Sequence, residues 1–148
     1  MVSEKLEASL KDIEARCDAI ESCYEYLLAY AAKGVNGDEV GGSSTELKHY
    51  LISAVDALQG LSEAWNKAIE DADLRPAIRY QNFLGILERD AADSQITIEL
   101  VLAQPWISSQ LIDNLNASLH LRALLTDMFL VDELVKTQLR SAAKLHSA

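Results

Sequence analysis

The sequence contains few residues that interrupt helices. Only two of its 148 residues are proline, Pro76 and Pro105, and runs of β-branched residues are scarce. Because proline ends helices and β-branched runs favour strands, the shortage of both predicts an all-helical chain. Glycine is also rare, and four of the six glycines fall within residues 34–44, which predicts one mobile loop there.

Cysteine is limited to Cys17 and Cys23. Six residues of helix span about 9 Å, beyond the separation of about 7 Å that a disulfide tolerates between Cα atoms. We therefore expect two reduced thiols and a cytoplasmic protein. The first ten residues, MVSEKLEASL, lack the apolar run of a signal peptide, and no stretch reaches the ~20 uncharged apolar residues of a membrane span.

Basic residues are outnumbered, with 13 Lys and Arg against 23 Asp and Glu and a net charge of −10. Nucleic acids and anionic membrane surfaces are bound largely through Lys and Arg, and no basic cluster offsets the imbalance. We therefore expect neither nucleic acid nor membrane as a partner. We interpret the excess of acidic residues as a charged surface that keeps the protein soluble.

The apolar residues follow helical spacing. Four stripes repeat at intervals of four and three residues, over residues 6–31, 47–72, 80–101 and 121–142. Ser43 and Glu46 form a predicted capping box for the second helix, and Asp73 is a predicted N-cap for the third. The fourth helix, residues 108–144, would overshoot the others by about 10 Å, which predicts a kink near Asn114–Asn116. The prediction is an up-down-up-down four-helix bundle forming a single domain, residues 1–148.

The last helix carries a second apolar face opposite its core stripe. Charged residues flank this face on both sides, as in helix-packing interfaces. Two residues of the third helix, near the Pro105 corner, are predicted to extend it. The predicted interface consists of Leu119, Ala123, Leu130, Leu134, Ile96 and Leu100. It favours a non-catalytic protein that forms a homo-oligomer or docks on a partner protein, as a scaffold, adaptor or accessory subunit.

A ligand site between the helices is the alternative hypothesis. Aligning antiparallel helices by their rise places Trp65, Tyr80 and Met128 at one level, opposite Leu10 and Ile13, and Tyr24 at another. Interiors of helical bundles do host small ligands. The second hypothesis is therefore a small-ligand binding module around Trp65, Tyr80, Met128 and Tyr24.

Motifs for catalysis or metal binding are sparse. Glu46 and His49 have the Glu-x-x-His spacing of di-iron bundles, but no second such motif exists, and His49 is predicted to face solvent. His120 is predicted at the edge of the interface. Cys17 is predicted in the core stripe and Cys23 at its flank, and neither has a nearby cation to stabilise a thiolate. We therefore expect no catalytic residue, no metal and no cofactor.

Overall fold

The computed structural model describes residues 3–36, 42–118 and 120–147, and this part of the chain is all-α, without strands. Six helices are described, rather than the four predicted. They are α1 Glu4–Ala32, α2 Gly42–Leu58, α3 Leu61–Ala72, α4 Ala77–Leu102, α5 Ser109–Ala117 and α6 His120–Ser147.

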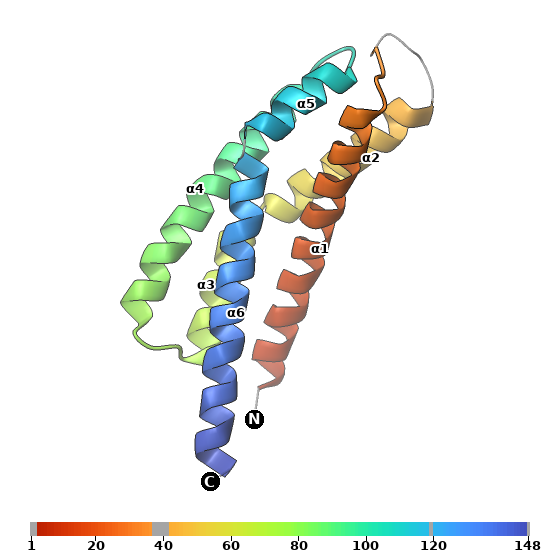
Figure 1. Cartoon of the computed structure of the whole chain (residues 1–148). Helices are drawn as coiled ribbons and strands as arrows, with labels where there is room; N and C mark the ends of the chain where they lie inside the picture. The colour runs from red at the N-terminus through yellow and green to blue at the C-terminus, as the bar shows by residue number, and fades with distance from the viewer. Residues whose placement is uncertain (1–2, 37–41, 119, 148) are drawn as a thin grey trace.

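The helices lie side by side, roughly along one common direction, and form an elongated molecule (Figure 1). α1 and α4 run in one direction, and the pairs α2–α3 and α5–α6 return in the other, so both chain ends lie at the same end of the molecule. α1 packs on α2, α3 and α5, while α4 packs on α3, α2 and α6. Contact between α1 and α6 is much sparser, and a groove lies between them.

The second predicted helix is divided at Gln59 and Gly60 into α2 and α3. Gly60 has a φ of 77°, a left-handed conformation that glycine adopts without steric penalty. The apolar spacing continues across the break, because Leu58 and Leu61 are both buried. Periodicity alone therefore did not reveal it.

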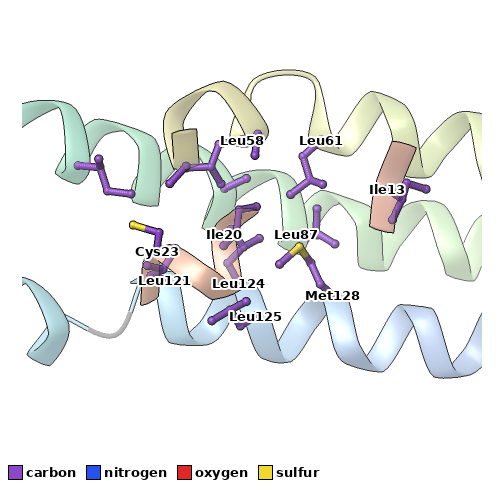
Figure 2. Packing of buried hydrophobic residues seen from close by; sticks show 14 of the residues in the cluster. Ile13, Ile20, Cys23, Leu58, Leu61, Leu87, Leu121, Leu124, Leu125 and Met128 are labelled. Atoms are coloured by element: carbon purple, nitrogen blue, oxygen red, sulfur yellow. The ribbon is translucent and has the colours of Figure 1, made fainter. Parts of the chain in front are cut away.

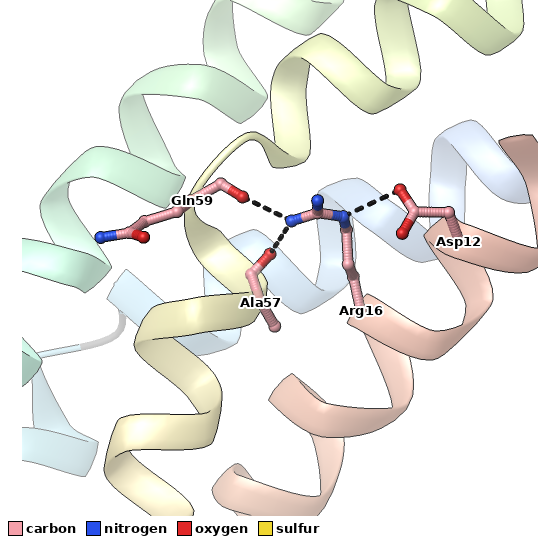
Figure 3. Close-up of polar contacts among 4 residues, drawn as sticks. All are labelled: Asp12, Arg16, Ala57 and Gln59. Atoms are coloured by element: carbon pink, nitrogen blue, oxygen red, sulfur yellow. Dashed lines mark hydrogen bonds and ion pairs between the residues drawn. The ribbon is translucent and has the colours of Figure 1, made fainter.

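Arg16 of α1 stabilises this break (Figure 3). Its Nη1 donates to the carbonyl of Ala57 at 3.0 Å and to that of Gln59, while its Nε pairs with Asp12 at 3.0 Å. The last carbonyls of a helix lack partners within the helix and carry partial negative charge. A cation from α1 therefore satisfies the end of α2.

The fourth predicted helix is divided after Ala117, directly beyond the predicted kink near Asn114–Asn116. Asn114 and Asn116 are helical residues of α5, and Ser118 is its C-cap. The Asn116 amide donates to the carbonyl of Leu27 at 3.2 Å, so it ties α5 to α1 instead of breaking the helix. With six described helices, the predicted four-helix bundle is not confirmed.

Two predicted caps were wrong. α2 already begins at Gly42, so the backbone of Ser43 is helical and Ser43 is not the N-cap. Residues 42–44 therefore belong to α2, although the predicted loop included them. Asp73 ends α3 as a left-handed C-cap with a φ of 51°, and Pro76 precedes α4. Residues 37–41 of the predicted loop lie outside the described residues.

The buried core uses most of the predicted stripes (Figure 2). In α1, Ile13 and Ile20 are buried as predicted, but Cys23 is fully buried while Cys17 is only half-buried. The prediction had placed Cys17 in the core and Cys23 at its flank. The reversal arises because α1 is covered by α2 and α5 on the Cys23 side and leaves the Cys17 side beside the open groove.

Candidate functional site: two surfaces beside α6

α6 presents two different surfaces on either side of its buried stripe. The buried stripe of α6 contains Met128 and Val135, and α4 and α1 pack on its two opposite sides. Because successive helical residues are rotated by about 100°, the residues beyond each side form a separate surface. Beyond the α4 flank lies the outer strip, which we define as Ala123, Thr126, Leu130, Leu134 and Thr137. On the α1 flank lies the α1–α6 groove.

The outer strip holds three of the predicted interface residues. Leu130 is 49% exposed and Leu134 is 42% exposed, while Ala123 is half-buried. Arg122, Ala123, Thr126 and Asp127 line a shallow hollow at its upstream end. Leu119, the fourth predicted residue of this helix, lies outside the described residues.

Asp90 and Asp127 mark the same level on α4 and α6, because their carboxyl groups interact with each other. Leu130 lies one turn from Asp127, and Ile86 one turn from Asp90 in the same direction, because the helices are antiparallel (Figure 1). Ile86 is 42% exposed and therefore extends the strip onto α4.

The predicted residues of α4 lie elsewhere. Ile96 and Leu100 are well exposed, but Ile96 lies beyond Asp90 in the opposite direction, about 13 Å along the helix axes from Leu130. At 100° per residue, Ile96 and Leu100 also lie on the side of α4 that faces away from α6. The register therefore argues against one continuous patch that joins Ile96 and Leu100 to the outer strip.

The Asp90–Asp127 pair is a point of charge repulsion beside the strip. Burial, a hydrogen bond with Asp90 and the charge of Asp90 raise the pKa of Asp127 to about 7. Its Oδ2 is buried without a hydrogen-bond partner. The packing of α4 against α6 therefore favours the neutral acid over the carboxylate.

The predicted ligand residues are not gathered around one cavity. Trp65 and Met128 are fully buried, and Tyr24 and Tyr80 are half-buried against the core. Met128 reaches the α1–α6 groove, together with Leu10 and Ile13, but the other three do not line it. The ligand module around these four side chains has correspondingly little support.

The α1–α6 groove has an apolar floor and acidic walls. Its volume is about 300 Å³. The floor consists of Leu10, Ile13, Cys17, Met128, Val135 and Leu139. The walls carry Glu14, Asp18 and Glu21 from α1 and Asp132 from α6, with Phe129 and Lys136 at the edge.

The thiol of Cys17 lies in the groove, where burial and nearby carboxylates both affect its pKa. The pKa of Cys17 is raised to about 12 by burial and by the nearby carboxylates of Asp132, Asp18, Glu21 and Glu14. Its Sγ lies 3.5 Å from the Sδ of Met128. Burial alone raises the pKa of Cys23 to about 12. Both groups are protonated near neutral pH and are poor nucleophiles.

The acidic wall of the groove was missed in the sequence, although a signal for it exists. Glu14, Asp18 and Glu21 repeat at intervals of four and three residues, directly beside Leu10 and Cys17. Such spacing places the three carboxylates on one edge of the apolar stripe. Which edge would be left open depends on the neighbouring helices.

The Glu46–His49 motif is not part of a metal-binding cluster among the described residues. No group of three or more His, Cys, Asp or Glu side chains there is placed to hold a metal ion. His49 is exposed and packs edge-on against Tyr50, while Glu46 accepts a hydrogen bond from the hydroxyl of Tyr26 at 3.5 Å. None of the helices described has both the length and the apolar character to cross a membrane.

Comparison with known proteins finds no family model, no curated protein and no solved structure that matches this chain. The two surfaces beside α6, the outer strip and the α1–α6 groove, are therefore the candidate sites of this protein. The first consists mainly of exposed aliphatic side chains. The second combines an apolar floor with negative charge.

Proposed function

We propose that this protein is a non-catalytic interaction module that pairs with a second copy through the outer strip of α6. In this role it serves as a scaffold, adaptor or accessory subunit. The observation that carries the proposal is the exposure of Leu130 and Leu134 on α6, with Ile86 exposed on the packed helix α4. Single exposed aliphatic residues are ordinary, but three neighbours across two helices are typical of a packing surface.

The layout of the strip supports a second copy as the occupant. It extends over about 21 Å from Ala123 to Thr137, and Leu130 stands at its centre. A two-fold axis at Leu130 would place Leu130 of each copy together and Thr126 opposite Leu134. The small side chains at positions 123, 126 and 137 would let the two helices approach closely.

The expected association is weak. Completing the burial of a half-exposed Leu or Ile contributes about 0.7–1.5 kcal/mol, so three side chains in each copy contribute about 4–9 kcal/mol. Set against the ~4–15 kcal/mol cost of association, this gain leaves at most about 5 kcal/mol of net binding free energy. Two copies with a charge of −10 each also repel one another, so added salt should strengthen the dimer.

The test is Leu130→Asp, with Ile52→Asp as a matched control. Ile52 on α2 is 51% exposed, against 49% for Leu130. In the dimer, the two new carboxylates would face each other at about 5 Å, which costs about 3 kcal/mol in addition to the lost apolar contact. We expect the dimer dissociation constant to rise more than 100-fold in Leu130→Asp and to stay unchanged in Ile52→Asp.

Sedimentation velocity and circular dichroism together read out the result. Unchanged helicity with loss of the dimer in Leu130→Asp alone supports the proposal. Equal sedimentation of both variants and the wild-type protein contradicts it. Loss of helicity in Leu130→Asp also contradicts it, because Leu130 would then belong to the interior of the single chain.

We also propose that the protein is located in the cytoplasm and that its helices form a bundle. Free Cys17 and Cys23 support a reducing compartment. The successive packing of α2 and α3 on α1 supports an up-down-up-down four-helix bundle in which the second and fourth helices are each broken once. Cell fractionation, with partial proteolysis of each fraction, would test the cytoplasmic location. A crystal structure would test the bundle architecture.

A further inference from the structure

The α1–α6 groove is an open, elongated hollow between two helices. It follows residues 10–21 of α1 and residues 128–139 of α6, and eleven residues of helix span about 16 Å. Three turns of a further helix have the same length. Helix-in-groove recognition uses such a row of apolar contacts, with polar groups along the edges.

The charge of the groove selects the partner. Glu14, Asp18, Glu21 and Asp132 contribute four negative charges, and Lys136 contributes one positive charge. Lys136 is already paired with Asp132, at 2.9 Å between Nζ and Oδ2. Among the described residues, no lysine or arginine forms an ion pair with the three carboxylates of the α1 wall.

We propose that the α1–α6 groove binds an amphipathic helix of a partner protein that carries basic residues beside its apolar face. The apolar face would contact Leu10, Cys17 and Leu139, which are the half-buried residues of the floor. Lys or Arg residues at intervals of four and three would then face Glu14, Asp18 and Glu21.

Two alternative occupants fit the groove less well. A second copy of this chain has a net charge of −10, so its approach to an acidic groove is unfavourable. A small ligand is normally enclosed, whereas this groove is open along one side and has a volume at the lower limit for such sites. The groove and the outer strip occupy opposite flanks of α6, so this proposal does not depend on the dimer.

The test uses a labelled synthetic peptide of about 15 residues, with Leu along one face and Lys at the predicted spacing. A second peptide carries Glu in place of each Lys. Fluorescence anisotropy should detect binding of the Lys peptide only. Raising the salt concentration to about 0.3 M should weaken the binding, since the charges lie at the solvent-exposed edge.

Two triple variants with the same net charge separate the groove from general attraction. The groove variant is Glu14→Gln, Asp18→Asn, Glu21→Gln. The control variant is Glu88→Gln, Asp93→Asn, Asp113→Asn, at exposed sites on α4 and α5. We expect the dissociation constant to rise about tenfold in the groove variant and less than twofold in the control. Equal weakening in both variants would overturn the proposal.

The methyl group of Met128 provides a readout that needs no variant. Met1 and Met128 are the two methionines of the chain, so a protein labelled with ¹³C-methyl methionine gives one signal from the groove floor. Met128 is fully buried, but its Sδ lies 3.5 Å from the Sγ of half-buried Cys17, so a peptide that packs on Cys17 should shift the Met128 signal. An unshifted signal overturns the proposal.

Alternative occupants have their own signatures in the same experiment. A Met128 shift that depends on protein concentration without peptide would assign the groove to a second copy. A shift with dodecyltrimethylammonium and none with the peptide would assign it to a small cationic amphiphile. Either result overturns the proposal. The Leu130→Asp variant should bind the Lys peptide as the wild-type protein does, so failure of the dimer and failure of the groove are distinguishable.

Discussion

Replacing Arg16 by Ala tests the account of how α1 holds the broken second helix. The variant loses two hydrogen bonds from a charged donor to the carbonyls of Ala57 and Gln59, and the ion pair with Asp12. Hydrogen bonds to charged groups contribute about 1.5–3 kcal/mol each, but the carbonyl of exposed Gln59 regains water. The exposed ion pair adds well under 1 kcal/mol. We therefore expect a loss of about 2–3 kcal/mol in the free energy of unfolding.

Urea denaturation followed by circular dichroism measures this loss. Arg16→Lys should recover less than half of it, because a single ammonium group cannot reproduce the planar arrangement of guanidinium donors. Arg140→Ala is the matched control, since the Arg140–Glu133 ion pair is about two-thirds exposed on both sides, and its loss should cost less than about 0.5 kcal/mol. If Arg16→Ala and Arg140→Ala destabilise the protein equally, the reasoning is refuted.

The remaining predictions concern titration and reactivity. Since the folded pKa of Asp127 is raised to about 7 from an ordinary value of 3.8, stability should fall as pH rises from about 4 to about 7. Asp127→Asn should flatten this fall and raise the melting temperature at pH 8 but not at pH 4; an unchanged pH profile would contradict it. Cys17 and Cys23 should resist a disulfide reagent at pH 7.5 until the chain is unfolded, and rapid native-state labelling of either would be inconsistent with their raised pKa values.

The helical class of the protein was predictable because it depends on local patterns. The spacing of apolar residues identified the stripes from which most of the core is drawn, including Leu51, Leu87 and Val131. Each helix can bury such a stripe against almost any similar neighbour. The helix type was therefore determined locally.

The helix breaks were less predictable, because they depend on contacts from elsewhere in the chain. The carbonyls that precede Gly60 accept hydrogen bonds from Arg16 of α1, and the side-chain amide of Asn116 donates to a carbonyl of α1. Neither partner lies nearby in the sequence. Local signals therefore located the break near Asn114–Asn116 to within a few residues but missed the break at Gly60.

The candidate surfaces were predictable only in part. The exposed face of α6 followed from the pattern around Leu130 and Leu134, whereas its extension to Ile86 required the register marked by Asp90 and Asp127. The groove required knowing which flank of α1 stays uncovered. A helical pattern gives the angle of each residue on its own helix but not the position of the next helix.

The mass of the wild-type protein in solution tests the central claim most directly. Sedimentation equilibrium should be run up to about 1 mM, the concentration at which an association worth about 4 kcal/mol is half complete. The account predicts an apparent mass that rises with concentration above the 16.3 kDa of one chain, and more steeply with added salt. A constant 16.3 kDa over the whole range would show that Leu130 and Leu134 face water, and would contradict the account.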